Sequence, residues 1–287
     1  NAFHSLRERG LKIQNPSTKY LMIAHLAPVF DREAGPTDPE VRRIFETLEN
    51  ISTEFNVPLL RLDDDQQGIY HVVAPEQGIT LPGMIVSGTD SHMCTNGGVG
   101  SLGVTVGYED AVHILAHDSL WFRPLSSILV TINGTLGFGV SPKDLALHVV
   151  SQLGAKGALG KCVEFAGSTV AQLSLEGRMT LCNMMVEAGA RGAVVAPDDA
   201  TLEYIHQRPL APKGKLWEQA EAHWRTLISG EDAPYAARYE FGTGELEPLV
   251  SWGTSPDQVC SITGVIPDPK SIQDSISRGD AERALDY

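Results

Sequence analysis

The sequence has few cysteines and no long apolar run, and both shortages exclude classes of protein. Its 287 residues include four cysteines that stand far apart, Cys94, Cys162, Cys182 and Cys260. Because no two of them form a Cys-x-x-Cys pair, the spacing supports neither a zinc ribbon nor a dithiol redox site. Scattered cysteines are typical of a reducing compartment, so we predict the cytoplasm, with the mitochondrial matrix as the alternative. No apolar run reaches the ~18–20 residues that span a bilayer and no signal-peptide pattern is present, so no membrane association is expected.

Basic residues are also in short supply. The chain has 22 Lys and Arg against 36 Asp and Glu, which gives a formal net charge of −14. This balance argues against a nucleic acid or an anionic membrane surface as the main partner. It leaves room for a small anionic substrate, because local basic groups and helix N-termini can reverse the field inside one pocket. The apolar content of 42% indicates a folded globular protein rather than a disordered one.

The hydrophobic pattern alternates between short apolar runs and longer segments with helical spacing. Strands are predicted at residues 20–24, 57–62, 84–87, 128–132, 162–165 and 192–196. Helices are predicted after a capping box that begins at Thr37, and at residues 108–117, 142–153, 174–188 and 216–228. Strands that alternate with helices are typical of the α/β class, with mainly parallel sheets.

More than one lobe is expected, because single hydrophobic cores stop growing near ~250–300 residues. We predict a first α/β lobe at residues 1–124, a second at 125–245 and the start of a third at 246–287. The chain begins without Met and stops inside an amphipathic helical pattern that has no C-cap. We therefore expect it to be a fragment, or the ordered part of a longer protein.

Asp90, Ser91 and His92 stand where an apolar strand gives way to a Gly-rich loop. Open α/β sheets place their chemistry at strand ends of this kind. Asp90 and His92 are two residues apart, so in an extended chain they share a face. A carboxylate beside an imidazole fixes the tautomer and raises its basicity, which suits proton transfer. The alternative is a polar turn that caps the next helix, and the pattern alone does not separate the two.

The loop that follows contains a formal dinucleotide fingerprint. Gly98, Gly100 and Gly103 fit G-x-G-x-x-G, with Asp118 twenty residues after the first glycine. The true fingerprint turns directly from strand into helix, whereas residues 88–97 intervene here. We favour tight packing of the loop on a sheet, and a nicotinamide-dependent dehydrogenase is the third-ranked function. Cys94 is interpreted in the same way, as a small residue in a packed loop.

Asn183 and Glu187 form a second candidate group. They are four residues apart, so on a helix the amide and the carboxylate share one face. Their neighbours are apolar, so Glu187 is expected to be desolvated, as an acid–base group or a polar anchor requires. The alternative is a solvated helix face, which the surrounding Met184 and Met185 argue against.

Two isolated histidines, His25 and His71, are each predicted at or near a strand end. A single histidine in such a place is more often structural than catalytic. Their placement parallels that of His92, and parallel strands bring their ends into one crevice. We therefore include both in the candidate site.

Several motifs in the same order resemble the aconitase family and, within it, the large subunits of 3-isopropylmalate dehydratases. The resemblance covers nearly all 287 residues and rests on six stretches: 68–71, 75–78, 81–84, 90–92 with its glycines, 174–184, and 252–256 with 267–269. It implies lobes with three α/β/α layers and mainly parallel sheets. It also implies a hydro-lyase that removes water from a hydroxy di- or tricarboxylate and adds it back, here 2-isopropylmalate in leucine biosynthesis.

The resemblance also implies roles for individual residues. Asp90 and His92 match the active-site Asp-Ser-His of the family, with Ser91 as a substrate-binding residue. His71 matches a histidine that helps to protonate the leaving hydroxyl, and His25 matches another active-site imidazole. Asn183 and Glu187 match an amide and a carboxylate near the open iron of a 4Fe–4S cluster, which acts as a Lewis acid.

The sequence departs from the family pattern in three ways. Ala24 stands where the family has an Asp before the first histidine, so His25 lacks its orienting carboxylate. The cluster cysteines are absent and are expected beyond Tyr287, so the fragment alone is expected to be inactive. The catalytic serine and the substrate-binding arginines are expected later still, partly on a small subunit that carries a swivelling domain. Homoaconitase, citraconate or dimethylmalate hydratase, and a non-catalytic scaffold or binding module without a cluster, remain the alternatives.

Overall fold

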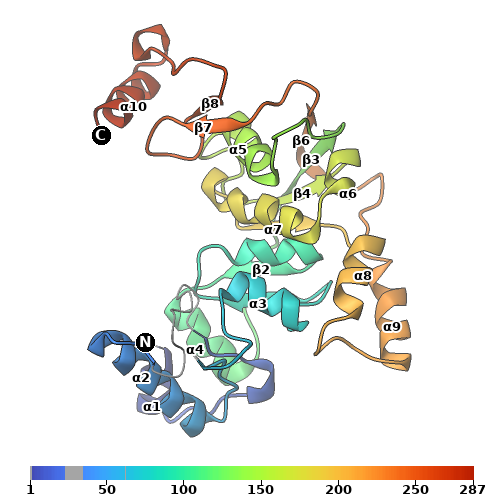
Figure 1. Ribbon diagram of the computed structural model, residues 1–287. Coiled ribbons are helices and arrows are strands. Elements are labelled where there is room, and N and C mark those ends of the chain that lie inside the picture. The colour runs from blue at the N-terminus through green and yellow to red at the C-terminus, as the bar shows by residue number, and fades with distance from the viewer. Residues whose placement is uncertain (1, 23–34, 62) are drawn as a thin grey trace.

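The computed structural model describes residues 2–22, 35–61 and 63–287, and shows an α/β protein with mainly parallel sheets (Figure 1). The N-terminal part contains helices α1 Ala2–Glu8, α2 Pro39–Phe55, α3 Tyr70–Gln77 and α4 Tyr108–His117, and the 3₁₀ helix η1 Pro16–Thr18. Strand β1 Ile85–Gly88 pairs in parallel with β2 Leu102–Thr105, and the 3₁₀ helix η2 Met93–Val99 connects them. None of the helices in the described ranges is long and apolar enough to cross a membrane.

A four-stranded parallel sheet with the order β5-β4-β3-β6 organises the middle of the chain. Its strands are β3 Ser127–Asn133, β4 Cys162–Ala166, β5 Gly192–Val195 and β6 Tyr235–Gly242. Between and after them lie α5 Pro142–Leu153, α6 Ser168–Gln172, α7 Leu175–Asn183, the 3₁₀ helix η3 Met184–Ala188, α8 Asp199–His206 and α9 Lys215–Trp224. This sheet lies within the predicted second lobe, although the lobe boundaries themselves stay a prediction.

The main hydrophobic core lies on one face of this sheet. Ile128, Val130 and Ile132 alternate along β3 and are fully buried, as a strand with one covered face requires. Helix α5 packs on them with Leu145 and Val149, which belong to the same buried cluster. The start of α5 is set by a capping box in which Ser141 and Asp144 satisfy each other's backbone amides.

The glycines of the predicted loop bring the two sheets together. A Cβ atom on Gly97 would overlap the backbone of Ala193 in β5, and one on Gly98 would overlap Met179 in α7. A Cβ atom on Gly103 would overlap the carbonyl group of Met93. The chain passes from β1 into the loop and η2, not directly into a phosphate-binding helix turn. The prediction that these glycines serve packing is therefore confirmed.

Several predicted elements differ from those observed. The long helix begins one residue later than expected, because Asp38 and not Thr37 accepts from the amide of Glu40. The strands predicted at 20–24 and 57–62 reduce to a single parallel bridge between Leu21 and Leu59 in the described residues; residues 23, 24 and 62 lie outside the described part of the chain. The helix predicted at 216–228 is α9, which ends at Trp224. The ring of Trp224 packs edge-on against that of Trp217 in the same helix.

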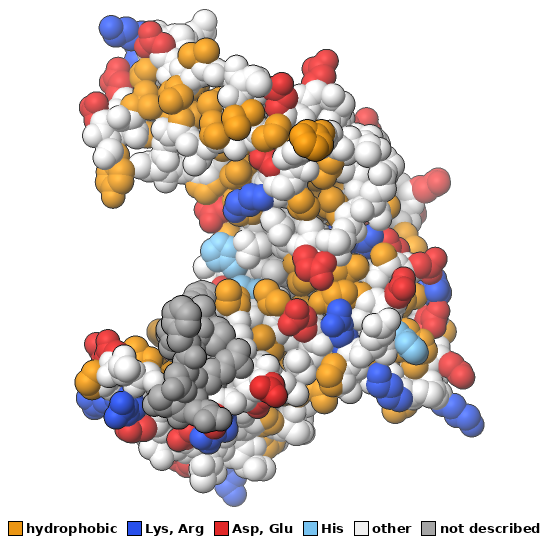
Figure 2. All heavy atoms as spheres, viewed as in Figure 1, with side chains coloured by type: hydrophobic (Ala, Val, Ile, Leu, Met, Phe, Trp, Pro, Cys, Tyr) orange, Lys and Arg blue, Asp and Glu red, His pale blue; other side chains and the backbone are white. Residues whose placement is uncertain are grey.

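The C-terminal segment extends the molecule into an arc. Strands β7 Leu249–Ser251 and β8 Val259–Ser261 form an antiparallel pair, followed by η4 Pro269–Ser271 and α10 Ser275–Asp286. In the space-filling view, this segment and the N-terminal helices stand on opposite sides of a hollow (Figure 2). Histidine side chains lie at the edge of that hollow, between the two arms.

Candidate active site

Asp90 is the residue on which the candidate site converges. It follows β1 by two residues, and its side chain is 17% exposed. Its Oδ1 atom lies 2.9 Å from Nε2 of His71 and accepts the backbone amide of His92 at 2.7 Å. Thr105, at the end of β2, donates its hydroxyl to the carbonyl oxygens of Asp90 and Ser91 and so fixes the turn. A carboxylate held in this way accepts from the imidazole and keeps the proton of His71 on Nε2.

His92 makes a second imidazole–carboxylate pair. Its Nε2 atom lies 3.5 Å from Oε1 of Glu187, and its Nδ1 atom lies 2.9 Å from the hydroxyl of Ser91. The same Nδ1 is 4.0 Å from Oδ1 of Asp90. Asp90 therefore stands between the two histidines, and the four groups form one series from His71 to Glu187. Such a series can hold and move protons at two imidazoles.

The amide of Asn183 joins the site from the other side. Its Nδ2 atom donates to the hydroxyl of Thr95 at 2.8 Å, and Thr95 donates to the carbonyl oxygen of His92 at 2.7 Å. The thiol of Cys94 points at the backbone carbonyl of Asn183, 3.5 Å away. Residues from the loop after β1 and from the end of α7, far apart in the sequence, are thus held together.

Two expectations about local structure are wrong, although the side chains still meet. His71 lies in the first turn of α3 and not at a strand end, because Gly78 in a left-handed conformation closes a short helix over residues 70–77. Asn183 and Glu187 do not share one α-helix, since α7 ends at Asn183 and η3 carries Glu187. The side chain of Glu187 is 34% exposed, so it is less desolvated than its apolar neighbours suggested. His25 and Ala24 lie outside the described residues.

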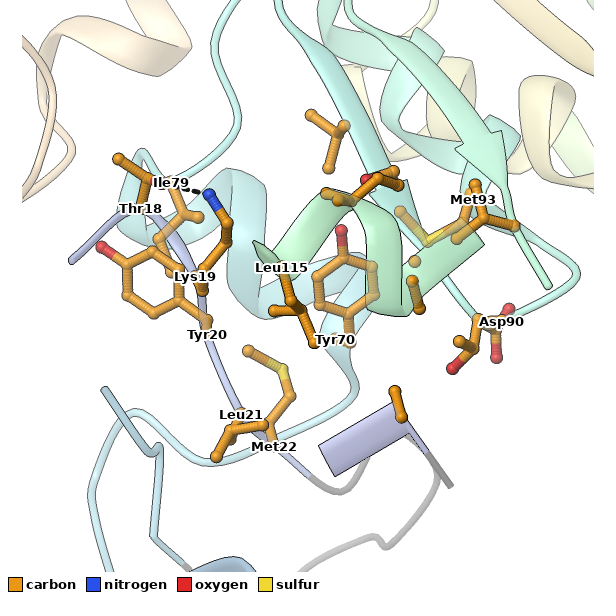
Figure 3. A pocket seen from close by; sticks show the side chains of 18 of the residues that line it. Thr18, Lys19, Tyr20, Leu21, Met22, Tyr70, Ile79, Asp90, Met93 and Leu115 are labelled. Carbon is orange, nitrogen blue, oxygen red and sulfur yellow. Dashed lines mark hydrogen bonds between the residues drawn. The ribbon is translucent and has the colours of Figure 1, made fainter. Parts of the chain in front are cut away.

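A cavity of about 1420 Å³ borders the site at Asp90 (Figure 3). Met93, Leu115 and Tyr70 also line it, and burial raises the pKa of the Tyr70 phenol to about 12. His71, Ser91, His92, Asn183 and Glu187 are not among the residues that line it. The cavity is therefore a neighbour of the assembled acid–base groups and not their common pocket.

The three buried cysteines, Cys94, Cys162 and Cys182, are poorly suited to hold a metal. Burial raises the pKa of the Cys94 thiol to about 12 and that of Cys162 to about 11, and it also raises the pKa of Cys182. Metal ligation uses the thiolate, which burial of this kind disfavours. In the described parts of the chain, no three His, Cys, Asp or Glu side chains group so that they could hold a metal ion.

Sequence reasoning missed two residues that shape the site. It considered Thr95 only as part of a packed loop, and it did not single out Thr105. Thr105 stands opposite Gly88 in the β1–β2 register, so the end of a paired strand was the signal that could have found it. Nothing local in the sequence indicates that Thr95 meets Asn183, because the contact joins residues 88 positions apart.

The fold and the site together define an α/β protein with an acid–base centre. Its two imidazole–carboxylate pairs each have one member on the loop after β1, Asp90 or His92, and one outside it, His71 in α3 or Glu187 in η3. A family profile described as "Aconitase family (aconitate hydratase)" matches residues 1–287, so the chain belongs to the aconitase family. Its class of activity is that of a hydro-lyase, and members of the family generally bind a 4Fe–4S cluster. The described residues supply no fitting set of ligands for that cluster.

Proposed function

We propose that this chain is the large-subunit part of a hydro-lyase that isomerises 2-isopropylmalate to 3-isopropylmalate by dehydration and rehydration. Family membership supports the reaction class. The resemblance of the motifs at residues 68–84, 90–103 and 174–184 supports the isopropylmalate branch of the family. The related hydro-lyases, which act on homoaconitate, citraconate or dimethylmalate, differ from it in the side chain of the acid.

The single observation that carries the proposal is the series of four groups from His71 through Asp90 and His92 to Glu187. Dehydration of a hydroxy acid removes a proton from carbon and adds a proton to the leaving hydroxyl, so it needs both an acid and a base. An imidazole paired with a carboxylate can serve as either, because the carboxylate stabilises the protonated form.

We assign the proton for the leaving hydroxyl to His71, whose Nε2 contacts Asp90. His92 is held at Nδ1 by Ser91 and at Nε2 by Glu187, and we assign it to the same proton relay. Ser91 is exposed beside it and is proposed to bind the substrate. The base that takes the proton from carbon is proposed to come from the small subunit with its swivelling domain.

The small subunit is also proposed to balance charge. The substrate carries two carboxylates, whereas Asp90 and Glu187 add negative charge to the site of a chain whose net charge is −14. Like charges in a poorly solvated site repel one another, so cationic groups must approach the bound substrate. Arginines on the partner would supply them.

A panel of hydroxy acids tests the proposal. The complete enzyme, with its partner and its cluster, is mixed with 2-isopropylmalate, homocitrate, citramalate or dimethylmalate, and the unsaturated acid is followed by its ultraviolet absorbance. We expect turnover of 2-isopropylmalate, its loss in Asp90→Asn, and its retention in the control Asp63→Asn, which changes an exposed turn. A preference for another acid would indicate that the chain belongs to one of the related hydro-lyases. If the cluster-loaded enzyme turned over none of the acids, the proposal would be contradicted.

A further inference from the structure

Thr95 lies where the loop after β1 meets the end of α7, between two residues of the candidate site. It belongs to η2, is 5% exposed, and touches both His92 and Asn183. We infer that Thr95 is a positioning residue that turns the carboxamide oxygen of Asn183 toward the hydroxyl of the substrate. This inference rests on the proposed function for the identity of the substrate, and on hydrogen-bond geometry for everything else.

The hydroxyl of Thr95 decides which end of the Asn183 amide faces it. A hydroxyl has one proton, and Thr95 donates it to the carbonyl oxygen of His92, 2.7 Å away, which can only accept. Toward Asn183, 2.8 Å away, the same oxygen can therefore only accept. The atom of Asn183 that meets it must be a donor, so it is Nδ2. The usual ambiguity between the nitrogen and the oxygen of an amide is removed here by the partners.

Fixing Nδ2 also fixes Oδ1, because the two atoms stand on opposite sides of one planar group. Among the residues that the structure describes, none donates a hydrogen bond to Oδ1 of Asn183. The residue itself is half-buried, its backbone carbonyl accepts from the thiol of Cys94, and the nitrogen of its side-chain amide is held by Thr95. Oδ1 is therefore a hydrogen-bond acceptor whose position is fixed, and a ligand hydroxyl is a donor that matches it.

The same hydroxyl links the acceptor to the proton relay. Thr95 holds the backbone of His92, whose ring meets Glu187, and it holds the side chain of Asn183. A hydroxy acid that donates to Oδ1 would thus be aligned with the imidazole of His92 through one intervening residue. Thr95 should therefore affect the recognition of the hydroxyl and not the recognition of the carboxylates.

Two substitutions separate positioning from packing. Thr95→Val keeps the shape of the side chain and removes the hydroxyl, which frees the Asn183 amide to rotate by half a turn. Thr95→Ser keeps the hydroxyl and removes a methyl group. Loss of one well-placed hydrogen bond corresponds to about a tenfold loss in affinity. We expect Thr95→Val to lower kcat/KM for 2-isopropylmalate by about that factor or more, and Thr95→Ser to restore most of it.

The decisive readout compares the substrate with 2-isopropylsuccinate, which has the same carbon skeleton without the hydroxyl. In the complete enzyme, Thr95→Val should lower kcat/KM for 2-isopropylmalate and leave the inhibition constant of 2-isopropylsuccinate unchanged. Equal losses for both ligands, or a Thr95→Ser variant as impaired as Thr95→Val, would overturn the inference, because either result indicates a role in packing alone.

A measurement on the wild-type chain keeps the test independent of turnover and of how the variants fold. The side-chain amide protons of Asn183, identified in nitrogen–proton spectra by their loss in Asn183→Asp, should exchange with solvent more slowly than those of the exposed Asn50. Exchange as fast as that of Asn50 would overturn the inference. If the wild type turns over no hydroxy acid but these protons are protected, the proposed function fails while the positioning by Thr95 stands.

Discussion

At the scale of single residues, Asp90 is the group that connects the histidines of the candidate site to each other. One of its oxygens meets the ring of His71 and the backbone of His92 at once. The identities of Asp90, Ser91, His92, Asn183 and Glu187 as candidates could be read from the sequence, because polar groups at the end of an apolar run are conspicuous. Their mutual distances could not, because those distances depend on contacts between distant segments.

Removal of the His92 ring should be far more damaging than removal of an exposed histidine. His92→Ala deletes the group between Ser91 and Glu187, and loss of a positioned acid–base group lowers kcat by at least ~100-fold. Steady-state kinetics of the complete enzyme measure the effect. The control is His223→Ala, on the exposed face of α9. Near-normal turnover of His92→Ala would remove His92 from the mechanism.

At the scale of elements, three of the four strands of the larger sheet could be predicted from their apolar runs, whereas β6 was not predicted. β3, β4, β5, α4 and α5 all occur where the sequence places them. The failures fall where tertiary contacts override local preference. His71 was expected at or near a strand end, but it lies in the short helix α3, which ends at Gly78. The helix expected at 174–188 tightens into η3 after Asn183, a change of pitch that local propensity does not encode.

The glycines between the sheets should tolerate no side chain. Gly103→Ala places a methyl group on the carbonyl group of Met93, so η2 must shift, and we expect a loss of about 3 kcal/mol or more in unfolding free energy. Gly244→Ala is the matched control, because no atom lies within 4 Å of its added carbon. Urea unfolding monitored by circular dichroism measures both. Equal midpoints for the two variants would show that η2 is not wedged between the sheets.

The buried ion pair between α7 and α8 should contribute stability that depends on pH. Arg178 is fully buried and donates two hydrogen bonds of 2.7 Å to Asp198, which also caps α8. Burial acts to raise the pKa of Asp198, but the hydrogen bonds from Arg178 and Thr201 outweigh it, so the pKa is lowered. Its stabilising effect is therefore complete above the unfolded value of ~3.9 and is lost as the pH falls through the lower folded value.

Asp198→Ala leaves the buried Arg178 without its carboxylate, and we expect the free energy of unfolding to fall by about 3 kcal/mol at neutral pH. This is the lower end of the usual range for a broken buried ion pair, because the side chain of Asp198 is itself 40% exposed. The deficit should begin to shrink as the pH falls below ~4, and it should continue to shrink toward the lowered pKa of the folded state, where the wild-type carboxylate takes up its proton. Asp199→Ala, which removes an exposed partner of Arg225, should change the midpoint little. Urea midpoints between pH 3 and pH 7 measure the difference, and a deficit that does not depend on pH would refute the assignment.

At the scale of the whole molecule, the candidate site lies where the two parallel sheets meet. Asp90 and His92 come from the loop after β1, whereas Asn183 and Glu187 come from the end of α7 and from η3, beside the larger sheet. The space-filling view shows a hollow between the N-terminal helices and the C-terminal arm (Figure 2). The proposed small subunit with its arginines would approach the site from that side.

The most direct test of the central claim is hydration of the unsaturated acid in water enriched in oxygen-18. The complete enzyme is given the alkene that 2-isopropylmalate forms on losing water, and the product is examined by mass spectrometry. We expect a hydroxy acid that carries the heavy oxygen, formed by the wild type and by the control His223→Ala but not by Asp90→Asn or His92→Ala. Formation of no hydroxy acid by the cluster-loaded wild type, or undiminished formation by Asp90→Asn, would contradict it.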